Sequence, residues 1–388
     1  MSRVDAAYVT AFRDWLACAF AGRRERAARA VRAAGDGLLE RVAWLGAAGH
    51  VLDFDDTYLP GIAHLSAPTA PAALALAAEL DRPVGEMLTA YAAGFQAMGT
   101  LARASHPGLY DRGFHPTAVC GAPAAAVVAA GLLDLDEERA GAGERLALLQ
   151  TGGVRATFGS DGKSLQVGMA AAAGVLAARA AAEGARIGAD AIGGPAGFAA
   201  ALGGGAPAPR TGDRPAIGDN WIKPWPCCLG THGALEAASD LRAAGHGAPP
   251  GEPIEVTVHP LSRAAAAYDD VADGLQAKFS IPYVVAYTLL RGEPGPESFA
   301  AVDPEARELA STRVRVRTDD SLLESEAVLA VDGEVVTRVR AARGSPGRPL
   351  DEAALREKVH GLAGERLDGL LDDPARPARE VLAVLEGG

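Results

Sequence analysis

Segments rich in alanine and other small residues recur along the first half of the chain and constrain its fold most strongly. Their apolar positions repeat every three or four residues, as in a helix with one buried face. Segments 70–80, 84–104, 117–131 and 136–157 follow this pattern. Only 5% of the residues are aromatic although 49% are hydrophobic, so the core is expected to consist of Ala, Leu and Val. This composition favours closely packed helices.

The pattern changes in the last third of the chain. Segments 254–258 and 327–340 alternate apolar and polar residues with period two, and the second contains Asp332-Gly333, a strong hairpin signal. A helical pattern at 281–291 lies between them. We therefore predict a mainly α protein in which residues 233–345 form a small α+β domain between helical segments.

Length and charge narrow the class of protein. A chain of 388 residues suits two domains, and its formal net charge of −12 argues against nucleic acid or an acidic membrane surface as a partner. The four cysteines form neither a disulfide framework nor the spaced set of a zinc site, which indicates a reducing cytoplasm. We expect no apolar run long enough to span a bilayer.

Residues 37–55 are predicted to form an apolar helix, and ionisable side chains gather where this segment ends and the chain enters a Pro/Gly loop. They are accompanied by two hydroxyls, and the set is His50, Asp53, Asp55, Asp56, Thr57, His64 and Ser66. Buried charges are costly unless they are paired or used, so this cluster is a candidate for chemistry. In isolation, its three carboxylates suggest a metal site.

Two further stretches are candidates for chemistry. Residues 105–117 form a polar loop that contains His106, Tyr110 and His115. Lys163 lies in a Gly-rich turn that leads into an Ala-rich helix at about 163–184. This turn is not a Walker A phosphate loop, because position 157 is Thr where the motif requires Gly.

These stretches together resemble the MmgE/PrpD family, which includes 2-methylcitrate dehydratase, cis-aconitate decarboxylase and an iminodisuccinate epimerase. The resemblance covers about residues 5–345 and is specific because four separated motifs occur in order. The motifs are Asp53-Phe-Asp-Asp-Thr57 with His64-x-Ser66-x-Pro68, Tyr110-x-x-Gly-Phe-His115-Pro-Thr117, Lys163 in its Gly turn, and Lys223-x-Trp-Pro followed by His232.

The resemblance implies a large all-helical domain formed by residues 1–232 and 346–388, a smaller α+β lid formed by residues 233–345, a homodimer and a site between the two domains. It implies catalytic roles for Asp53, His64, His115, Lys163 and Tyr283, the last in Lys278-Phe-Ser-Ile-Pro-Tyr283. It implies substrate-binding roles for Thr57, Lys223 and His232. No metal and no organic cofactor are implied.

The chemistry of these residue types agrees with the small di- and tricarboxylic acids that the family uses. Removal of a proton beside a carboxylate requires a base and groups that stabilise the developing negative charge. Histidine suits the first task, and Lys163 at a helix N-terminus suits the second. We expect a cofactor-independent lyase, with dehydration as the favoured reaction, epimerisation or isomerisation as the second and decarboxylation as the third.

Some features of the chain depart from the family pattern or allow other classes of protein. Position 166 is Gln where many members have His, and the segment around His64 reads Ala-His-Leu-Ser rather than Gly-His-Pro-Ser. A magnesium-dependent terpene cyclase would need a further carboxylate near Asp55-Asp56 and more aromatic residues. A non-catalytic binding protein is the remaining alternative, and the joint presence of Asp53, His64, His115 and Lys163 argues against it.

Overall fold

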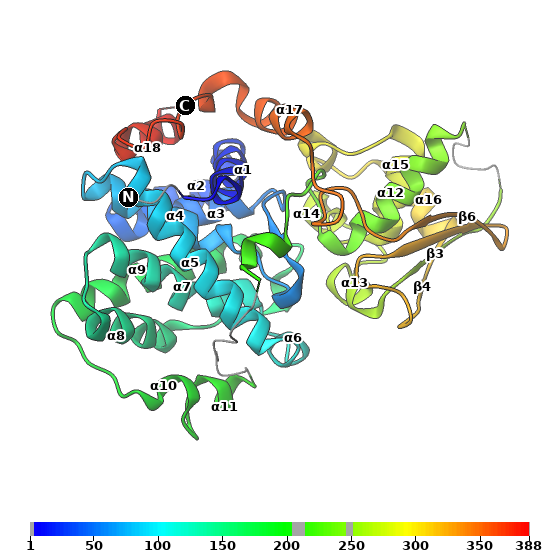
Figure 1. Cartoon of the computed structure of the whole chain (residues 1–388). Helices are drawn as coiled ribbons and strands as arrows, with labels where there is room; N and C mark the ends of the chain where they lie inside the picture. Colours follow the sequence, from blue (N-terminus) through cyan, green and yellow to red (C-terminus); the bar gives the residue numbers. More distant parts are fainter. Residues whose placement is uncertain (1–3, 204–213, 246–250, 388) are drawn as a thin grey trace.

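The structure is a computed structural model that describes residues 4–203, 214–245 and 251–387. Two hydrophobic cores divide it into a helical domain and a smaller lid domain, which lie side by side (Figure 1). The mainly α fold class is thereby confirmed. The second core already includes Trp221 and Trp225, so the chain enters the lid before residue 232.

In the part of the chain that the structure describes, the helical domain is built from ten longer helices. They are α1 (Ala6–Gly22), α2 (Arg26–Ala34), α3 (Leu38–His50), α4 (Ser66–Glu79), α5 (Val84–Ser105), α7 (Pro116–Leu132), α8 (Glu137–Ala147), α9 (Asp161–Ala182), α17 (Glu352–Ala363) and α18 (Ala378–Glu386). The last two return from the lid and cover α1 and α4 (Figure 1). Shorter helices are α6 (Gly108–Asp111), α10 (Asp190–Gly193) and α11 (Phe198–Leu202).

Glycines allow α3 and α9 to cross at close range. A Cβ atom at Gly46 would lie 2.7 Å from the Gly168 Cα, and one at Gly168 would lie 2.2 Å from the Ala43 carbonyl oxygen. The crossing needs glycine on both helices, since real Cβ atoms do not approach other atoms so closely. It brings the C-terminus of α3 beside the first turn of α9.

Two predicted helices are shorter than their sequence patterns suggest. The helix expected at 136–157 ends at Ala147, and Gly153, with φ of +107°, lies in the turn that follows. The apolar segment 37–55 is helical only to His50, because Asp53 takes a left-handed conformation with φ of +53°.

The lid contains a four-stranded mixed sheet in the order β4–β3–β5–β6. Its strands are β3 (Ile254–Val258), β4 (Val314–Thr318), β5 (Ala327–Val331) and β6 (Glu334–Val339). Strand β3 pairs in parallel with β4 and antiparallel with β5, and the predicted hairpin joins β5 to β6. The lid helices are α12 (Leu229–Ala243), α13 (Pro260–Ala265), α14 (Gly274–Ala277), α15 (Ile281–Arg291) and α16 (Pro304–Arg313).

A short antiparallel pair ties the first motif to the chain that enters the lid. Strand β1 (Thr57–Tyr58) pairs with β2 (Asn220–Trp221), a contact for which the sequence contains no short-range signal. The pairing holds Thr57 close to the boundary between the two domains.

Helix α9 corrects one expectation. Among the described residues it is the one helix long and apolar enough to cross a membrane by length and composition. Half of its most apolar 18-residue stretch is buried within the protein, as is common for a core helix.

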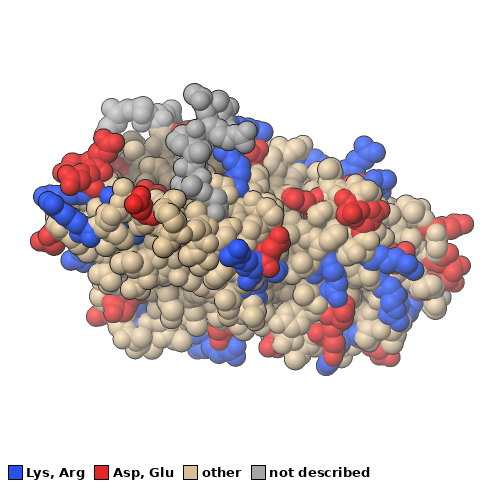
Figure 2. Space-filling view, turned by 90° about the horizontal axis from the view of Figure 1, so that it is seen from below, with Lys and Arg blue, Asp and Glu red and all other residues tan. Residues whose placement is uncertain are grey.

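The surface charge of the protein is mixed. On the face shown in Figure 2, basic and acidic side chains are interspersed rather than gathered into one basic patch.

Candidate active site

The loop that follows α3 is held by buried lysines from distant parts of the chain. Their ammonium groups donate to three consecutive backbone carbonyls: Lys278 to Leu52 at 2.6 Å, Lys223 to Asp53 at 2.8 Å and Lys358 to Phe54 at 2.8 Å. Two of these lysines come from the lid side of the chain and one from α17. The conformation of this loop therefore depends on its contacts with side chains from both domains.

Asp53 lies at the centre of this loop and is buried. Its Oδ1 is 2.7 Å from the Lys163 Nζ and 3.3 Å from the Lys223 Nζ. Burial alone would raise the pKa of the Asp53 carboxyl, but the two ammonium groups hold that pKa well below its usual value. Asp53 is thus a carboxylate, and the group formed by Asp53, Lys163 and Lys223 has a net positive charge.

His50 connects Lys163 to a second carboxylate. The Lys163 Nζ is 2.8 Å from the His50 Nε2, and the His50 Nδ1 is 2.8 Å from the Asp55 Oδ2. Burial lowers the pKa of His50 despite the nearby Asp55. His50 therefore links the Asp55 carboxylate to the Lys163 ammonium group.

His64 lies beside this chain of contacts. Its Nδ1 is 2.7 Å from the Asp56 carbonyl oxygen and 3.4 Å from the Thr57 Oγ1. A carbonyl can only accept a hydrogen bond, so the Nδ1 carries the proton and the Nε2 retains its lone pair. Burial lowers the pKa of His64 to about 3, which keeps the imidazole neutral.

His115 precedes α7, whose first residue is Pro116. Its backbone is extended there because it is the N-cap position, and its ring projects toward α9 and His50. The His115 Nδ1 is 2.7 Å from the Gln166 Nε2. Burial, and then the charge of Lys163, hold the pKa of His115 well below its usual value.

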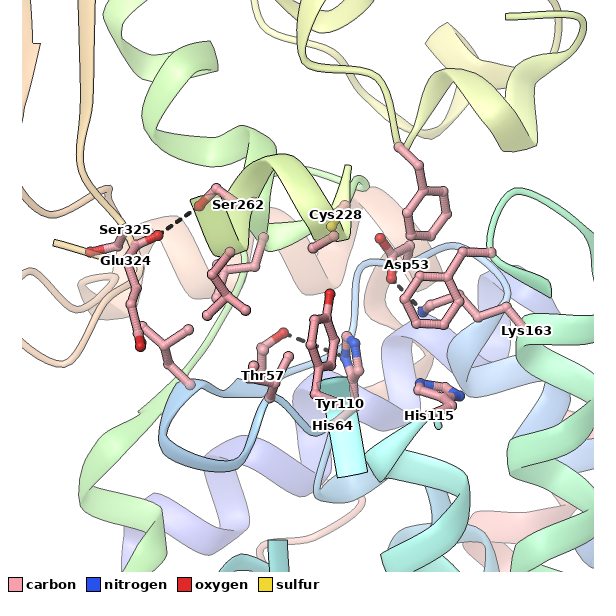
Figure 3. Close-up of a pocket in the computed structure, with 18 residues that line it drawn as sticks. Asp53, Thr57, His64, Tyr110, His115, Lys163, Cys228, Ser262, Glu324 and Ser325 are labelled. Atoms are coloured by element: carbon pink, nitrogen blue, oxygen red, sulfur yellow. Dashed lines mark hydrogen bonds and ion pairs between the residues drawn. The ribbon is translucent and has the colours of Figure 1, made fainter. Parts of the chain in front are cut away.

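A cavity between the two domains brings these groups together (Figure 3). Five of the eight residues proposed from the sequence line it: Asp53, Thr57, His64, His115 and Lys163. The helical-domain wall is completed by Leu59, Ile62, Tyr110 and Phe158. The lid wall consists of Cys228, Leu229, Gly230, Leu261, Ser262, Ala265, Phe279, Glu324 and Ser325.

The other three proposed residues lie outside the cavity lining. Lys223 lies behind Asp53, and the His232 Nε2 is 3.2 Å from the Cys227 carbonyl oxygen. Tyr283 is buried in the lid core, where its hydroxyl accepts a hydrogen bond from the Asp303 backbone N–H at 2.9 Å. Lys223 therefore reaches the cavity only through its contacts with Asp53, and Tyr283 and His232 are not among the residues that line the cavity.

Tyr110, which the sequence places in the polar loop 105–117, also lines the cavity. Its buried hydroxyl has no hydrogen-bond partner among the described residues. Burial raises its pKa to about 12, so the phenol remains protonated. Figure 3 shows Tyr110 beside Thr57 and His64. Among the lid residues that line the cavity, Phe279 lies in the motif that ends at Tyr283, whereas most of the others carry no sequence signal, because only the fold brings them to this position.

His50, Asp55 and His64 are grouped closely enough to be compared with a metal site. The His50 Nδ1 already forms a hydrogen bond with Asp55, and the His64 Nδ1 forms one with the Asp56 carbonyl. The Lys163 ammonium group also lies 2.8 Å from the His50 Nε2. A metal ion would have to replace these hydrogen bonds beside a buried positive charge. The donor set therefore suits a hydrogen-bonded network better than a cation.

Comparison with known families agrees with the arrangement of domains and motifs. The MmgE/PrpD N-terminal domain matches residues 39–211, and the MmgE/PrpD C-terminal domain matches residues 225–382. No curated protein matches the chain. Members of the matched family are generally enzymes of the hydro-lyase kind. Both halves of the family pattern are present and in order, so the chain belongs to the MmgE/PrpD family.

Proposed function

We propose that this protein is a cofactor-independent lyase that removes water from a small di- or tricarboxylic acid, as 2-methylcitrate dehydratase does. One observation carries the proposal: the neutral His64 imidazole and the Lys163 ammonium group line the same cavity. The first can accept a proton, and the second can bind a carboxylate. Dehydration beside a carboxylate requires both.

The contacts of Lys163 suit it to bind the substrate. Its ammonium group has three protons, and His50 and Asp53 accept hydrogen bonds at 2.8 and 2.7 Å. The third proton is available to a substrate carboxylate. Because the charge of Lys163 draws electrons from that carboxylate, the adjacent C–H becomes more acidic.

A single base is enough to account for every proton and electron pair in the proposed dehydration. The His64 Nε2 takes the proton from the carbon beside the carboxylate, and the C–H electron pair forms the new C=C bond. The C–O bond at the neighbouring carbon breaks, and the leaving hydroxide takes the proton back from the His64 imidazolium as water. His64 ends neutral, so no cofactor or second reactant is needed.

The remaining proposals concern partners and location. We propose a homodimer in the cytoplasm, with a small anionic carboxylate as substrate and with no nucleic acid or membrane as partner. Support for self-association comes from α9, where the apolar residues Met169 and Leu176 are 60% and 47% exposed in the single chain. Sedimentation of the purified protein measures this directly, and a monomer at all concentrations would contradict it.

A proton NMR assay in D2O tests the reaction. The protein is incubated with a panel of hydroxylated and unsaturated di- and tricarboxylic acids. Dehydration produces a vinyl proton or, where the deprotonated carbon carries a methyl group, a vinylic methyl singlet in place of a doublet. Epimerisation replaces a proton by deuterium with inversion, and decarboxylation changes the splitting of the protons next to the carbon that has lost its carboxylate. We expect the first pattern with at least one hydroxy acid.

His64→Gln and His360→Gln are the matched variants for this assay. His360 is on α17, away from the cavity, and its Nε2 is 2.9 Å from Asp368. We expect turnover to be lost in His64→Gln and kept in His360→Gln. Absence of turnover and of deuterium exchange for every acid would overturn the enzyme proposal, whereas exchange with inversion would replace dehydration by epimerisation.

A further inference from the structure

The Gln166 side-chain amide is anchored in one orientation. Its Oε1 accepts a hydrogen bond from the Val154 backbone N–H at 2.9 Å. Its Nε2 is 3.1 Å from the Thr157 Oγ1, whose own proton goes to the Val154 carbonyl at 2.8 Å. Rotating the amide by half a turn would set two donors against each other at Val154, so the Nε2 must face Thr157 and His115.

This orientation determines which nitrogen of His115 carries the proton. The Gln166 Nε2 is 2.7 Å from the His115 Nδ1, and an amide NH2 group can only donate. The His115 Nδ1 must therefore accept, and the proton of the neutral ring is on the Nε2. His64 has the opposite arrangement, because its Nδ1 donates to the Asp56 carbonyl.

We infer that Gln166 is a positioning residue that keeps His115 as a neutral Nε2–H donor, so that His64 is the base and His115 is a hydrogen-bond donor to the substrate. This inference rests on the proposed function for its catalytic meaning. A neutral imidazole that donates its N–H to a substrate oxygen stabilises the negative charge that develops there, without giving up the proton.

The groups that face His115 are consistent with a neutral ring. They are Lys163, His50, His64 and Asp53, of which Lys163 opposes a second positive charge and Asp53 favours one. Protonation of His115 would also set its Nδ1–H against the Gln166 NH2 group. Both effects keep His115 from serving as a second base.

The assignment bears on the type of reaction. Inversion at carbon by two bases requires a proton acceptor on one face and a proton donor that exchanges on the other. With His115 held as a neutral donor, the pair His64 and His115 contains one base. Elimination of water, in which a single base returns the proton to the leaving hydroxide, fits this arrangement.

Histidine-labelled protein and ¹⁵N NMR test the tautomers without any substrate. His115→Ala identifies the resonances of His115. In the wild type we expect the His115 Nδ1 to be unprotonated and the Nε2 protonated. Gln166→Glu replaces the amide donor by an acceptor, and we expect the proton to move to the Nδ1 and the pKa of His115 to rise by about one to three pH units. Gln166→Met, which removes the hydrogen bond and keeps the volume, should leave a mixture of tautomers.

Turnover of the same variants separates the two proposals. We expect Gln166→Glu to lower kcat with a smaller change in KM and to change the acid limb of the pH profile, which a merely structural defect would not do. A wild-type His115 protonated at the Nδ1 would overturn the inference, even if dehydration occurs. The expected tautomers without turnover of any carboxylic acid would overturn the proposed function instead and leave the role of Gln166 in fixing the tautomer intact.

Discussion

The two walls of the cavity differ in chemistry. The helical-domain wall contains Asp53, His64, His115 and Lys163, all buried or nearly so. Each is held by a short hydrogen bond: Lys163 to Asp53, His64 to the Asp56 carbonyl and His115 to Gln166. The lid wall is mostly apolar, and the Ser262 hydroxyl on it already donates to the Glu324 carbonyl at 2.7 Å (Figure 3). The same cavity therefore has one reactive side and one enclosing side.

The difference indicates a division of roles. Groups that act on a proton must be held in place, and the close crossing of α3 and α9 brings Lys163 to His50. An apolar wall excludes water and selects the shape of the substrate. We expect variants of the first wall to affect kcat and stability, and variants of the second to affect KM.

The largest expected effect is that of His64→Gln on turnover. Removal of a general base lowers rates by about 10²- to 10⁴-fold. We expect a loss in this range in kcat, with KM little changed, in steady-state kinetics with the acid identified by NMR. A loss of less than tenfold would remove His64 from the reactive wall.

Lys163→Met should also be destabilising, because it leaves Asp53 buried with one partner fewer. Breaking a buried ion pair from one side costs about 3–5 kcal/mol. Urea unfolding measures this loss. The double variant Asp53→Asn with Lys163→Met should recover part of the stability but not the activity. If the double variant is as unstable as the sum of both single variants, the two residues do not interact.

Because some of its histidines are buried, we expect the protein to have a lower free energy of unfolding in acid. The pKa of His64 and of His232 is lowered from 6.5 to about 3, largely by burial. The unfolded chain therefore takes up protons near pH 6.5 and the folded chain does not, so the free energy of unfolding falls as the pH drops from 6.5 toward 3. Each such histidine contributes a slope of about 1.4 kcal/mol per pH unit.

His232→Gln tests this slope outside the cavity. We expect the dependence of the unfolding free energy on pH to become shallower by one proton than in the wild type. An equal slope in the two proteins would show that His232 is not held neutral by burial.

The smallest expected effect is that of Leu261→Ala on the lid wall. Loss of apolar contact with the substrate should raise KM by about tenfold, with kcat nearly unchanged. A large fall in kcat would show that the lid wall also takes part in the reaction and would end the distinction between the walls.

The sequence predicted much of the fold because helix periodicity and turn residues are local properties. The patterns at 84–104 and 281–291 became α5 and α15, and Asp332-Gly333 became the turn between β5 and β6. The ends of α3 and α8 were wrong, since left-handed residues and glycines in the loops stop a helix even when the apolar pattern continues.

By itself, the sequence determined the family, the helical character and the residues that were candidates for chemistry, because motif order and residue type are readable along the chain. Only the tertiary structure decided which candidates share the cavity, that Tyr283 lies away from it, and which nitrogen of His64 and of His115 is free. Those answers depend on contacts between residues such as Lys163 and Asp53, which are far apart in sequence. Burial and hydrogen-bond partners, which set pKa values and tautomers, exist only once the chain is folded.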